Sequence, residues 1–552
     1  MSPAELAIHI RRLHKTSSCF DDTSLLADDE AMRLNEPAKR LLDEAGVPLH
    51  LIPVAEGGQL SNMQNLMLVL RAVCAKDMSF GLGYILTTFM AATNLWIAGN
   101  PIQRDMFSSL LRQGKKIAIA YHELAHGNDL NANELTAQVV QGGFILNGRK
   151  EVINNAALAS AVVLYARTGE TYDTASHSLF FVWLDPLPIG CRILSRFRTH
   201  GARTCHITGF EFSNCFVPSA CLMGNIGSGF THASKAFQLT RAVLPGVSLG
   251  VVDHALGMTV RYSATRKLYG GTVLDIPYVR AVLAEIFLEL CIADRLTRAM
   301  SACIHLFPAQ MSVYGALCKY IVPRRMMHAL RQLSTVLGAA GYVCTGTTGL
   351  FEKILRDYPV LSLGHASSRT CEAIVAAQLG PILKRQPSEP DPNVISHVYR
   401  TFEAGPLEPR ALRVASMQAD PLLASTKLWP EKLRERLNGG QLKQNQFVLL
   451  NEIAGNLTSA IEDLKVMEIG ANAPHIGHIV ERYALLHCGV ALLNAWIYAE
   501  HEETSLSCEI VTGGLGMIDA HLHRRPFVLD LGLEEKIISH LLAKSMNSEP
   551  VI

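Results

Sequence analysis

The chain has 552 residues, of which 49% are hydrophobic and 18% are charged. This balance is typical of a globular protein with a large core, and a net charge near +1 gives no electrostatic reason to expect nucleic-acid or membrane-surface binding. The 13 cysteines are scattered, without a C-x-x-C pair, which favours reduced thiols over a disulfide framework. We therefore expect a cytoplasmic protein that does not bind nucleic acid.

Residues 1–115 are predicted to form an N-terminal helical domain. Apolar residues recur at three- and four-residue spacing in the segments 31–45, 62–75 and 102–112. Residues 78–103 contain no charged side chain, but Gly, Thr, Asn and Pro residues interrupt the run, so we expect a buried helix and no transmembrane segment. The first residues lack the apolar core of a signal peptide.

The remaining chain divides into three further predicted domains. Residues 116–225 form a central β domain, with short β-branched or alternating runs between Gly and Asn turns; the expected strands lie at 137–140, 144–146, 161–166, 179–184 and 206–212. Residues 226–385 return to the helical period and predict a helical bundle. A Pro-rich linker, 386–393, precedes an additional helical domain at 394–552, with helices expected at 431–436, 448–467, 475–503 and 534–544. The predicted fold class is α+β.

The segment Tyr121–Asp129 has two interpretations. His122, Glu123 and His126 spell H-E-x-x-H, the pattern of a zinc site in which both histidines lie on one face of a helix. However, residues 116–121 suit a strand as well as a helix, residues 127–129 are typical of a turn, and no third histidine follows at the expected spacing. We therefore predict no metal site.

Five motifs in order point to the second interpretation. They are Leu41–Gly46 leading to Glu56-Gly57-Gly58; Ala120–Asp129, which matches A-L-T-E-P-x-A-G-S-D at Glu123, Gly127 and Asp129; Leu146–Lys150 with Ile153 and Asn155; Thr240-Arg241 followed by Arg266-x-x-Tyr269-Gly270; and Leu337–Tyr342 followed by Arg356-Asp357. Together, over roughly residues 35–385, they resemble the acyl-CoA dehydrogenase superfamily.

The resemblance implies an FAD-dependent oxidoreductase of the acyl-CoA dehydrogenase fold, with the helices after residue 394 as a C-terminal extension. Such enzymes oxidise the α,β bond of an acyl thioester, here carried by coenzyme A or an acyl carrier protein. Electron-transfer flavoprotein or oxygen would be the electron acceptor. A homodimer or homotetramer is expected.

The resemblance also implies a set of site residues. Those expected to contact the cofactor are Tyr121, His122, Glu123, Val152, Ile153, Asn154, Arg266, Tyr269, Thr335, Gly338 and Ser367. Arg266 would meet the pyrophosphate across a subunit interface, since a guanidinium offers forked donors to phosphate. Residues expected at the substrate are Asn128, Arg241 and Gly364.

Several positions depart from the family pattern. His122 stands where the family has a threonine, Val152 where it has a tryptophan over the ring, and Asn154 where it has a second threonine. The family's adenine-side glutamines fall at Pro277 and Thr335.

The catalytic base is the largest departure. The position of the family's usual glutamate is His365, and the alternative carboxylate position used by a minority of members is Thr240. A neutral imidazole, with a pKa near about 6.5, suits proton abstraction. His365 is thus the predicted base, with a pocket-lining histidine as the alternative. Two further hypotheses stay open: a flavin-dependent monooxygenase, and a non-catalytic scaffold on the same fold.

Overall fold

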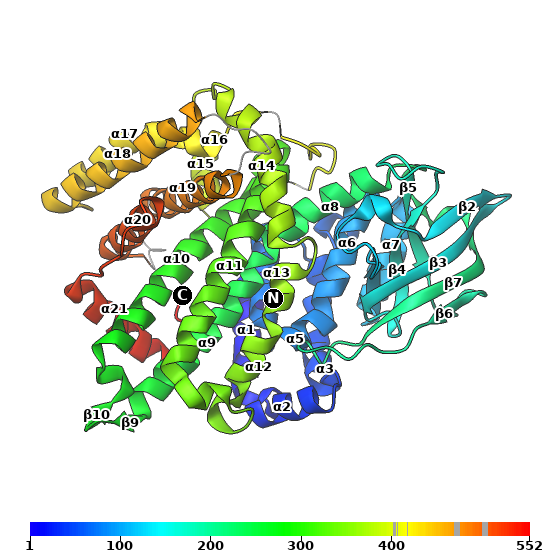
Figure 1. Ribbon diagram of the computed structural model, residues 1–552, viewed down its shortest axis with the longest axis horizontal. Helices are drawn as coiled ribbons and strands as arrows, with labels where there is room; N and C mark the ends of the chain where they lie inside the picture. The colour runs from blue at the N-terminus through cyan, green and yellow to red at the C-terminus, as the bar shows by residue number, and fades with distance from the viewer. Residues whose placement is uncertain (401–404, 406, 417, 468–474, 500–505) are drawn as a thin grey trace. The chain divides into compact units, whose positions relative to one another are not determined.

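The computed structural model describes residues 1–400, 405, 407–416, 418–467, 475–499 and 506–552 (Figure 1). The chain separates into two compact units. The first contains residues 1–240 together with 345–360 and 364–366, and the second contains residues 241–344, 361–363 and 367–552.

The N-terminal helices of the first unit begin at well-formed caps. In α1 the Ser2 hydroxyl accepts from the Glu5 N–H while the Glu5 carboxylate accepts from the Ser2 N–H, which satisfies two backbone donors at once. The helices are α1 Pro3–Thr16, α2 Asp22–Glu30, α3 Glu36–Glu44, α4 Met63–Cys74, α5 Met78–Gly81, α6 Thr87–Ala98 and α7 Pro101–Arg112. The predicted helix at 31–45 is shorter than expected, because Asn35 caps the N-terminus of α3.

A mixed eight-stranded sheet follows (Figure 1). Its strands are β1 Lys116–Ala120, β2 Thr136–Val140, β3 Gly143–Asn154, β4 Ala159–Arg167, β5 His177–Trp183, β6 Cys191–Ile193, β7 Ile207–Pro218 and β8 Leu222–Met223. The order is β6-β7-β3-β2-β4-β5-β8, and β1 pairs parallel with β4. The apolar side chains of these strands form a continuous core. All five predicted strands are confirmed.

The second unit is built around long helices. Its first helices are α9 Pro245–Thr265, α10 Pro277–Leu306, α11 Met311–Leu337 and α14 Ser368–Lys384. Helix α12 Gly349–Asp357 and most of α8 Gly229–Val243 belong to the first unit, and α13 Pro359–Leu363 is divided between the two. A short hairpin, β9 Lys267–Leu268 and β10 Gly271–Thr272, follows α9.

The C-terminal extension contains α15 Pro392–Tyr399, α16 Pro421–Ala424, α17 Trp429–Asn438, α18 Gln444–Val466, α19 Ile476–Ile497, α20 Cys508–Leu522 and α21 Leu531–Met546. Part of the helix predicted at 475–503 lies outside the described residues. Helix α20 was not predicted, because Gly513 and Gly514 weaken its helical pattern. A Cβ at Gly513 would lie 2.5 Å from a Leu533 methyl group, and one at Gly514 would lie 2.7 Å from a Leu492 methyl group, so the glycines permit close packing.

Among the residues that the structure describes, three helical segments are long and apolar enough to cross a membrane, namely 78–98, 229–265 and 476–497. Between 72% and 94% of each apolar window is buried inside the fold. The expectation that 78–103 forms a buried helix agrees with this burial.

Candidate functional site

The segment after β1 is not a helix. Residues 121–123 are extended and 124–128 form turns, so the helical geometry that an H-E-x-x-H zinc pair needs is not formed. Each side chain of the pattern has another partner: a His122 nitrogen lies 3.1 Å from the Glu151 carbonyl oxygen, and His126 Nε2 lies 3.1 Å from Glu134 Oε1. The spelling of a zinc motif is therefore coincidental.

Glu123 is committed to a buried ion pair. Lys150 Nζ, on a fully buried side chain, donates to Glu123 Oε1 at 2.7 Å and to the Tyr121 carbonyl at 3.2 Å. The Glu123 carboxylate also accepts from the backbone N–H groups of Glu134 and Leu135. Burial opposes the charge of Glu123, but Lys150 outweighs it and lowers the pKa of that carboxyl. The Glu123 carbonyl accepts from the N–H groups of His126 and Gly127, so both the carboxylate and the carbonyl of this residue serve the turn.

Residues 121–122, directly after β1, lie beside the bulge in β3. The Glu151 N–H donates to the His122 carbonyl at 3.1 Å, which brings Val152 next to this segment. Val152 is the extra residue of the bulge, is 37% exposed, and has a φ of 57°. A β-branched residue rarely adopts this left-handed conformation, and strain of this kind is concentrated at functional sites.

The next two residues of β3 direct their side chains into the protein. Ile153 belongs to the core of the sheet. Asn154 Nδ2 donates to the Leu82 carbonyl at 3.1 Å and to Thr87 Oγ1 at 2.7 Å. The prediction that the Asn154 side chain replaces a threonine donor to the cofactor is therefore not supported, because both amide hydrogens have partners within the fold. Tyr121 is also buried, and its hydroxyl donates to Asn94 Oδ1.

His365 meets Thr240, although 125 residues separate them in the chain. Thr240 Oγ1 lies 3.3 Å from His365 Nδ1 and donates its hydrogen to the Phe237 carbonyl at 3.1 Å. The His365 ring also packs edge-on against the Phe237 ring, with a centroid distance of 5.1 Å. The two positions at which the sequence placed a possible base are thus in hydrogen-bond contact.

The loop that carries His365 has an unusual backbone. His365 and the following Ala366 both have positive φ angles, 55° and 79°. The Arg356-Asp357 pair anchors the preceding helix: Arg356 donates to Asp29 Oδ2 at 2.6 Å, and Asp357 accepts from the Ala202 N–H at 2.7 Å. These contacts hold the end of α12, and α13 lies between α12 and the loop.

Six predicted site residues belong to the second unit. Arg241 is buried, and burial lowers the pKa of its guanidinium. Arg266, the C-cap of α9, is exposed directly before the β9–β10 hairpin, Tyr269 is exposed in its turn, and Thr335 is exposed near the end of α11. Gly338 ends α11 with φ 56° and ψ −134°, a conformation open essentially to glycine alone. Ser367 caps α14 by accepting from the Thr370 N–H. Asn128 and Gly364, both in the first unit, are exposed in loops.

Sequence reasoning overlooked two residues of this arrangement. Lys150 lay inside a quoted motif, yet its burial against Glu123 has no local sequence signal. Phe237 lies one helical turn before Thr240, and only the fold shows that its ring packs against His365.

Comparisons with known proteins agree with this architecture. Residues 118–215 match the acyl-CoA dehydrogenase middle domain, and residues 227–380 match the acyl-CoA dehydrogenase C-terminal domain. Benzylmalonyl-CoA dehydrogenase of Aromatoleum aromaticum is 26% identical over 376 residues, which cover 67% of this chain and 97% of the relative.

Solved structures with the same fold include butyryl-CoA dehydrogenase from Megasphaera elsdenii, with a TM-score of 0.63 at 17% identity, covering 68% of this chain and 97% of that one. The FAD complex of PigA has a TM-score of 0.61 at 19% identity, covering 69% of this chain and 97% of that one.

Proposed function

Because the chain belongs to the acyl-CoA dehydrogenase superfamily, we propose that it is an FAD-dependent dehydrogenase of acyl thioesters in which His365 is the base. The observation that carries this proposal is the contact between His365 and Thr240. The carrier of the acyl group would be coenzyme A or an acyl carrier protein.

The proposed mechanism uses the tautomer of His365 in which Nδ1 carries the hydrogen. In this arrangement the single hydrogen of the Thr240 hydroxyl is donated to the Phe237 carbonyl, and the Thr240 oxygen accepts from His365 Nδ1. The lone pair of the imidazole then lies on Nε2. In the proposed reaction Nε2 takes the α-proton, the β-hydride leaves the substrate, and a C=C bond forms between the two carbons.

The residues near the β3 bulge are compatible with a flavin held mainly through backbone groups. Val152 is strained and partly exposed beside His122. It would leave open the face of the flavin ring that the family's tryptophan covers. By family resemblance, residues 121–123 and 152–154 border the ring, and Arg266 and Gly338 contact the dinucleotide. FAD, when bound, supplies a two-electron acceptor for the hydride.

The remaining partners are also proposals. Electron-transfer flavoprotein or oxygen would reoxidise the flavin, and the exposed Arg266 directly before the hairpin is available to a second subunit of a homodimer or homotetramer. We propose that the enzyme acts in the cytoplasm.

The experiment is anaerobic reduction of the purified, FAD-loaded protein by a series of acyl thioesters on both carriers. Bleaching of the flavin band near about 450 nm by a thioester supports dehydrogenation. Reduction only by an external reductase, followed by oxygen uptake, would instead indicate a monooxygenase. A protein that takes up no flavin would indicate a scaffold.

The base is tested in the same assay with three variants. His365→Ala should slow bleaching by roughly 100-fold or more, as expected for loss of a general base. His365→Glu should retain more activity than His365→Ala, because it places a carboxylate at the same position. Thr240→Val, which preserves shape but not the hydroxyl, removes an acceptor that stabilises the imidazolium, so it should lower both the pH of half-maximal rate and the maximal rate. Unchanged bleaching by His365→Ala would refute the assignment.

A further inference from the structure

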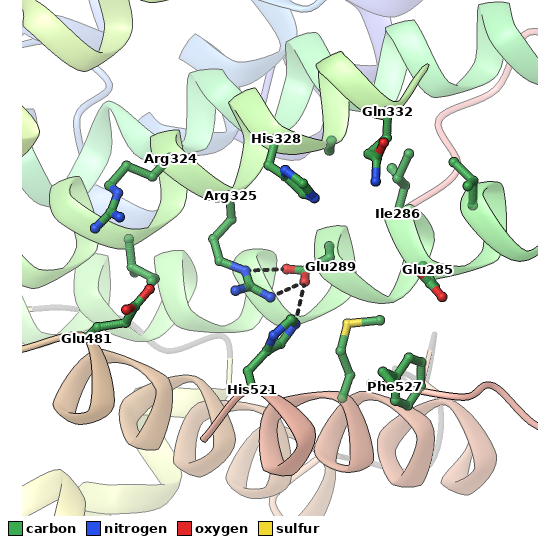
Figure 2. A pocket seen from close by; sticks show the side chains of 14 residues that line it. Glu285, Ile286, Glu289, Arg324, Arg325, His328, Gln332, Glu481, His521 and Phe527 are labelled. Carbon is green, nitrogen blue, oxygen red and sulfur yellow. Dashed lines mark hydrogen bonds and ion pairs between the residues drawn. The ribbon is translucent and has the colours of Figure 1, made fainter. Parts of the chain in front are cut away.

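A pocket in the second unit lies between α10, α11, α19 and α20 (Figure 2). Its volume is about 370 Å³, at the lower end of the range for small-molecule sites, roughly 300–1,000 Å³. Charged side chains line it on the α10 and α11 sides, and apolar side chains gather near one end. None of the predicted catalytic or cofactor residues lines this pocket.

The centre of the pocket is electrically balanced. The Arg325 guanidinium donates through two nitrogens to the Glu289 carboxylate, with Nε at 2.8 Å from Oε2, and His521 Nε2 lies 3.5 Å from Oε1 (Figure 2). Burial opposes ionisation, but Arg325 and His521 outweigh it and lower the pKa of Glu289 to about 2. Arg325 is therefore occupied and is not available to an anionic ligand.

Glu285 lies one helical turn before Glu289 and is not neutralised. Among the residues that the structure describes, no Lys, Arg or His nitrogen lies within 4.0 Å of its carboxylate. Burial and the nearby Glu289 raise the pKa of Glu285. A cationic group placed beside this carboxylate would remove an unfavourable isolated charge.

The surroundings of Glu285 are apolar and aromatic. Val282 and Ile286 on α10, Met517 on α20 and Phe527 line the same pocket, and Glu285, Ile286 and Phe527 appear on one side of the view in Figure 2. At the other end Glu481 lies near Arg324, whose guanidinium is 4.6 Å from the Tyr320 ring centre. The pocket thus combines a carboxylate with an aromatic ring, the pair of groups that recognises ammonium ligands.

We propose that this pocket binds a small primary amine, with its ammonium group at Glu285 and its apolar body against Met517 and Phe527. An ammonium donates charge-assisted hydrogen bonds to the carboxylate, and the ring face adds a cation–π contribution. The side chains that line the pocket include three carboxylates and two guanidiniums. When the histidines are neutral, the net charge of the pocket is negative, which disfavours an anionic ligand. This site goes beyond the proposed oxidation and does not depend on it.

The test is calorimetric titration of the full chain with phenethylamine and, separately, with 2-phenylethanol, which has the same shape without the charge. We expect saturable binding of the amine and none of the alcohol. Glu285→Gln should weaken amine binding by roughly 10-fold to 100-fold, the loss of one charged hydrogen bond. Glu481→Gln is the matched control, a carboxylate at the other end of the same pocket, and should bind within about threefold of wild type.

Three outcomes would overturn the proposal: no saturable amine binding by the wild type, equal binding of the alcohol, or equal affinity of the Glu285→Gln and wild-type proteins. Circular dichroism verifies that the Glu285→Gln protein is folded. A half-buried carboxylate of raised pKa is replaced by its neutral isostere in this variant, so folding should be preserved.

Discussion

Replacing Lys150 by Met removes the cation of the buried Glu123–Lys150 pair and preserves the length of the side chain. The two charged atoms are 2.7 Å apart, and the Lys150 side chain is completely buried. Their gross attraction is about 6 kcal/mol at an effective dielectric constant of about 20, but desolvation offsets much of it. Removing one partner of such a pair leaves an uncompensated charge and typically costs about 3–5 kcal/mol.

We expect Lys150→Met to lie near the lower limit, about 3 kcal/mol, because the backbone N–H groups of Glu134 and Leu135 still donate to Glu123. Urea unfolding at pH 7, followed by circular dichroism, gives the free energy of unfolding from midpoint and slope. The matched control is Arg149→Met, which removes the exposed neighbouring ion pair with Glu211 and should cost under about 1 kcal/mol.

The complementary variant Glu123→Gln should be sensitive to pH. Burial lowers the pKa of Lys150 to about 8 even with Glu123 present, and loss of the carboxylate would lower that pKa further. The unfolded chain then binds a proton that the folded chain lacks, so stability rises with pH and the deficit of Glu123→Gln should grow as pH falls from 8 to 6. The double variant Glu123→Gln/Lys150→Met should recover part of the loss. A Lys150→Met protein within about 1 kcal/mol of wild type would refute this reasoning.

Three other changes have definite expected outcomes. Asp420 accepts hydrogen bonds from Tyr314, Tyr483 and His487, whose combined effect outweighs burial and lowers the pKa of Asp420 to about 2. The stabilising contribution of this carboxylate is therefore present at neutral pH and is lost as pH falls from about 4 to about 2. The difference in free energy of unfolding between wild type and Asp420→Asn, measured by urea unfolding, should shrink across that interval. Gly338→Ala should destabilise the protein by about 1–3 kcal/mol through backbone strain alone, because the added Cβ would meet no atom within 4 Å. The control is Gly455→Ala, at an equally open position within α18. It should stabilise the protein by about 0.5–1 kcal/mol in the same assay. Val152→Asn should raise the free energy of unfolding by up to about 1 kcal/mol, because Asn tolerates a φ of 57° better than Val; an unchanged or lowered value would show that the bulge is not strained.

The sequence predicted the order of structural elements well because hydrophobic periodicity is a local signal. The change from helices to strands lies at Lys116, where β1 begins, and the return to helices lies at Gly229, where α8 begins. Helix α20 escaped prediction because its glycines serve contacts with Leu492 and Leu533, and packing between distant segments overrides local propensity. The same limit applied to Lys150, whose partner is 27 residues away.

The candidate site was predicted only at the level of positions. Matching motifs identified residues 121–123, 152–154 and 365, but not which side chains are free to act. Asn154 and Glu123 proved to be occupied by partners within the fold, and those partners come from other elements. A motif specifies residue types in order. Whether a side chain is available to a ligand depends on its hydrogen bonds to residues that are distant in sequence, and these form only in the folded protein.

The backbone of the His365 loop and the His365 imidazole are held by different contacts. Two consecutive positive φ angles, at His365 and Ala366, cost free energy and need support from the surrounding structure. On either side of these two residues the Gly364 N–H donates to the Val360 carbonyl at 2.9 Å, and Ser367 caps α14 by accepting from the Thr370 N–H. Neither contact uses the side chain of residue 365, so the proposed exchange of the family's glutamate for histidine leaves both in place. The imidazole itself is oriented by the Thr240 hydroxyl, 3.3 Å from Nδ1, and by the edge-on Phe237 ring, and both contacts come from α8.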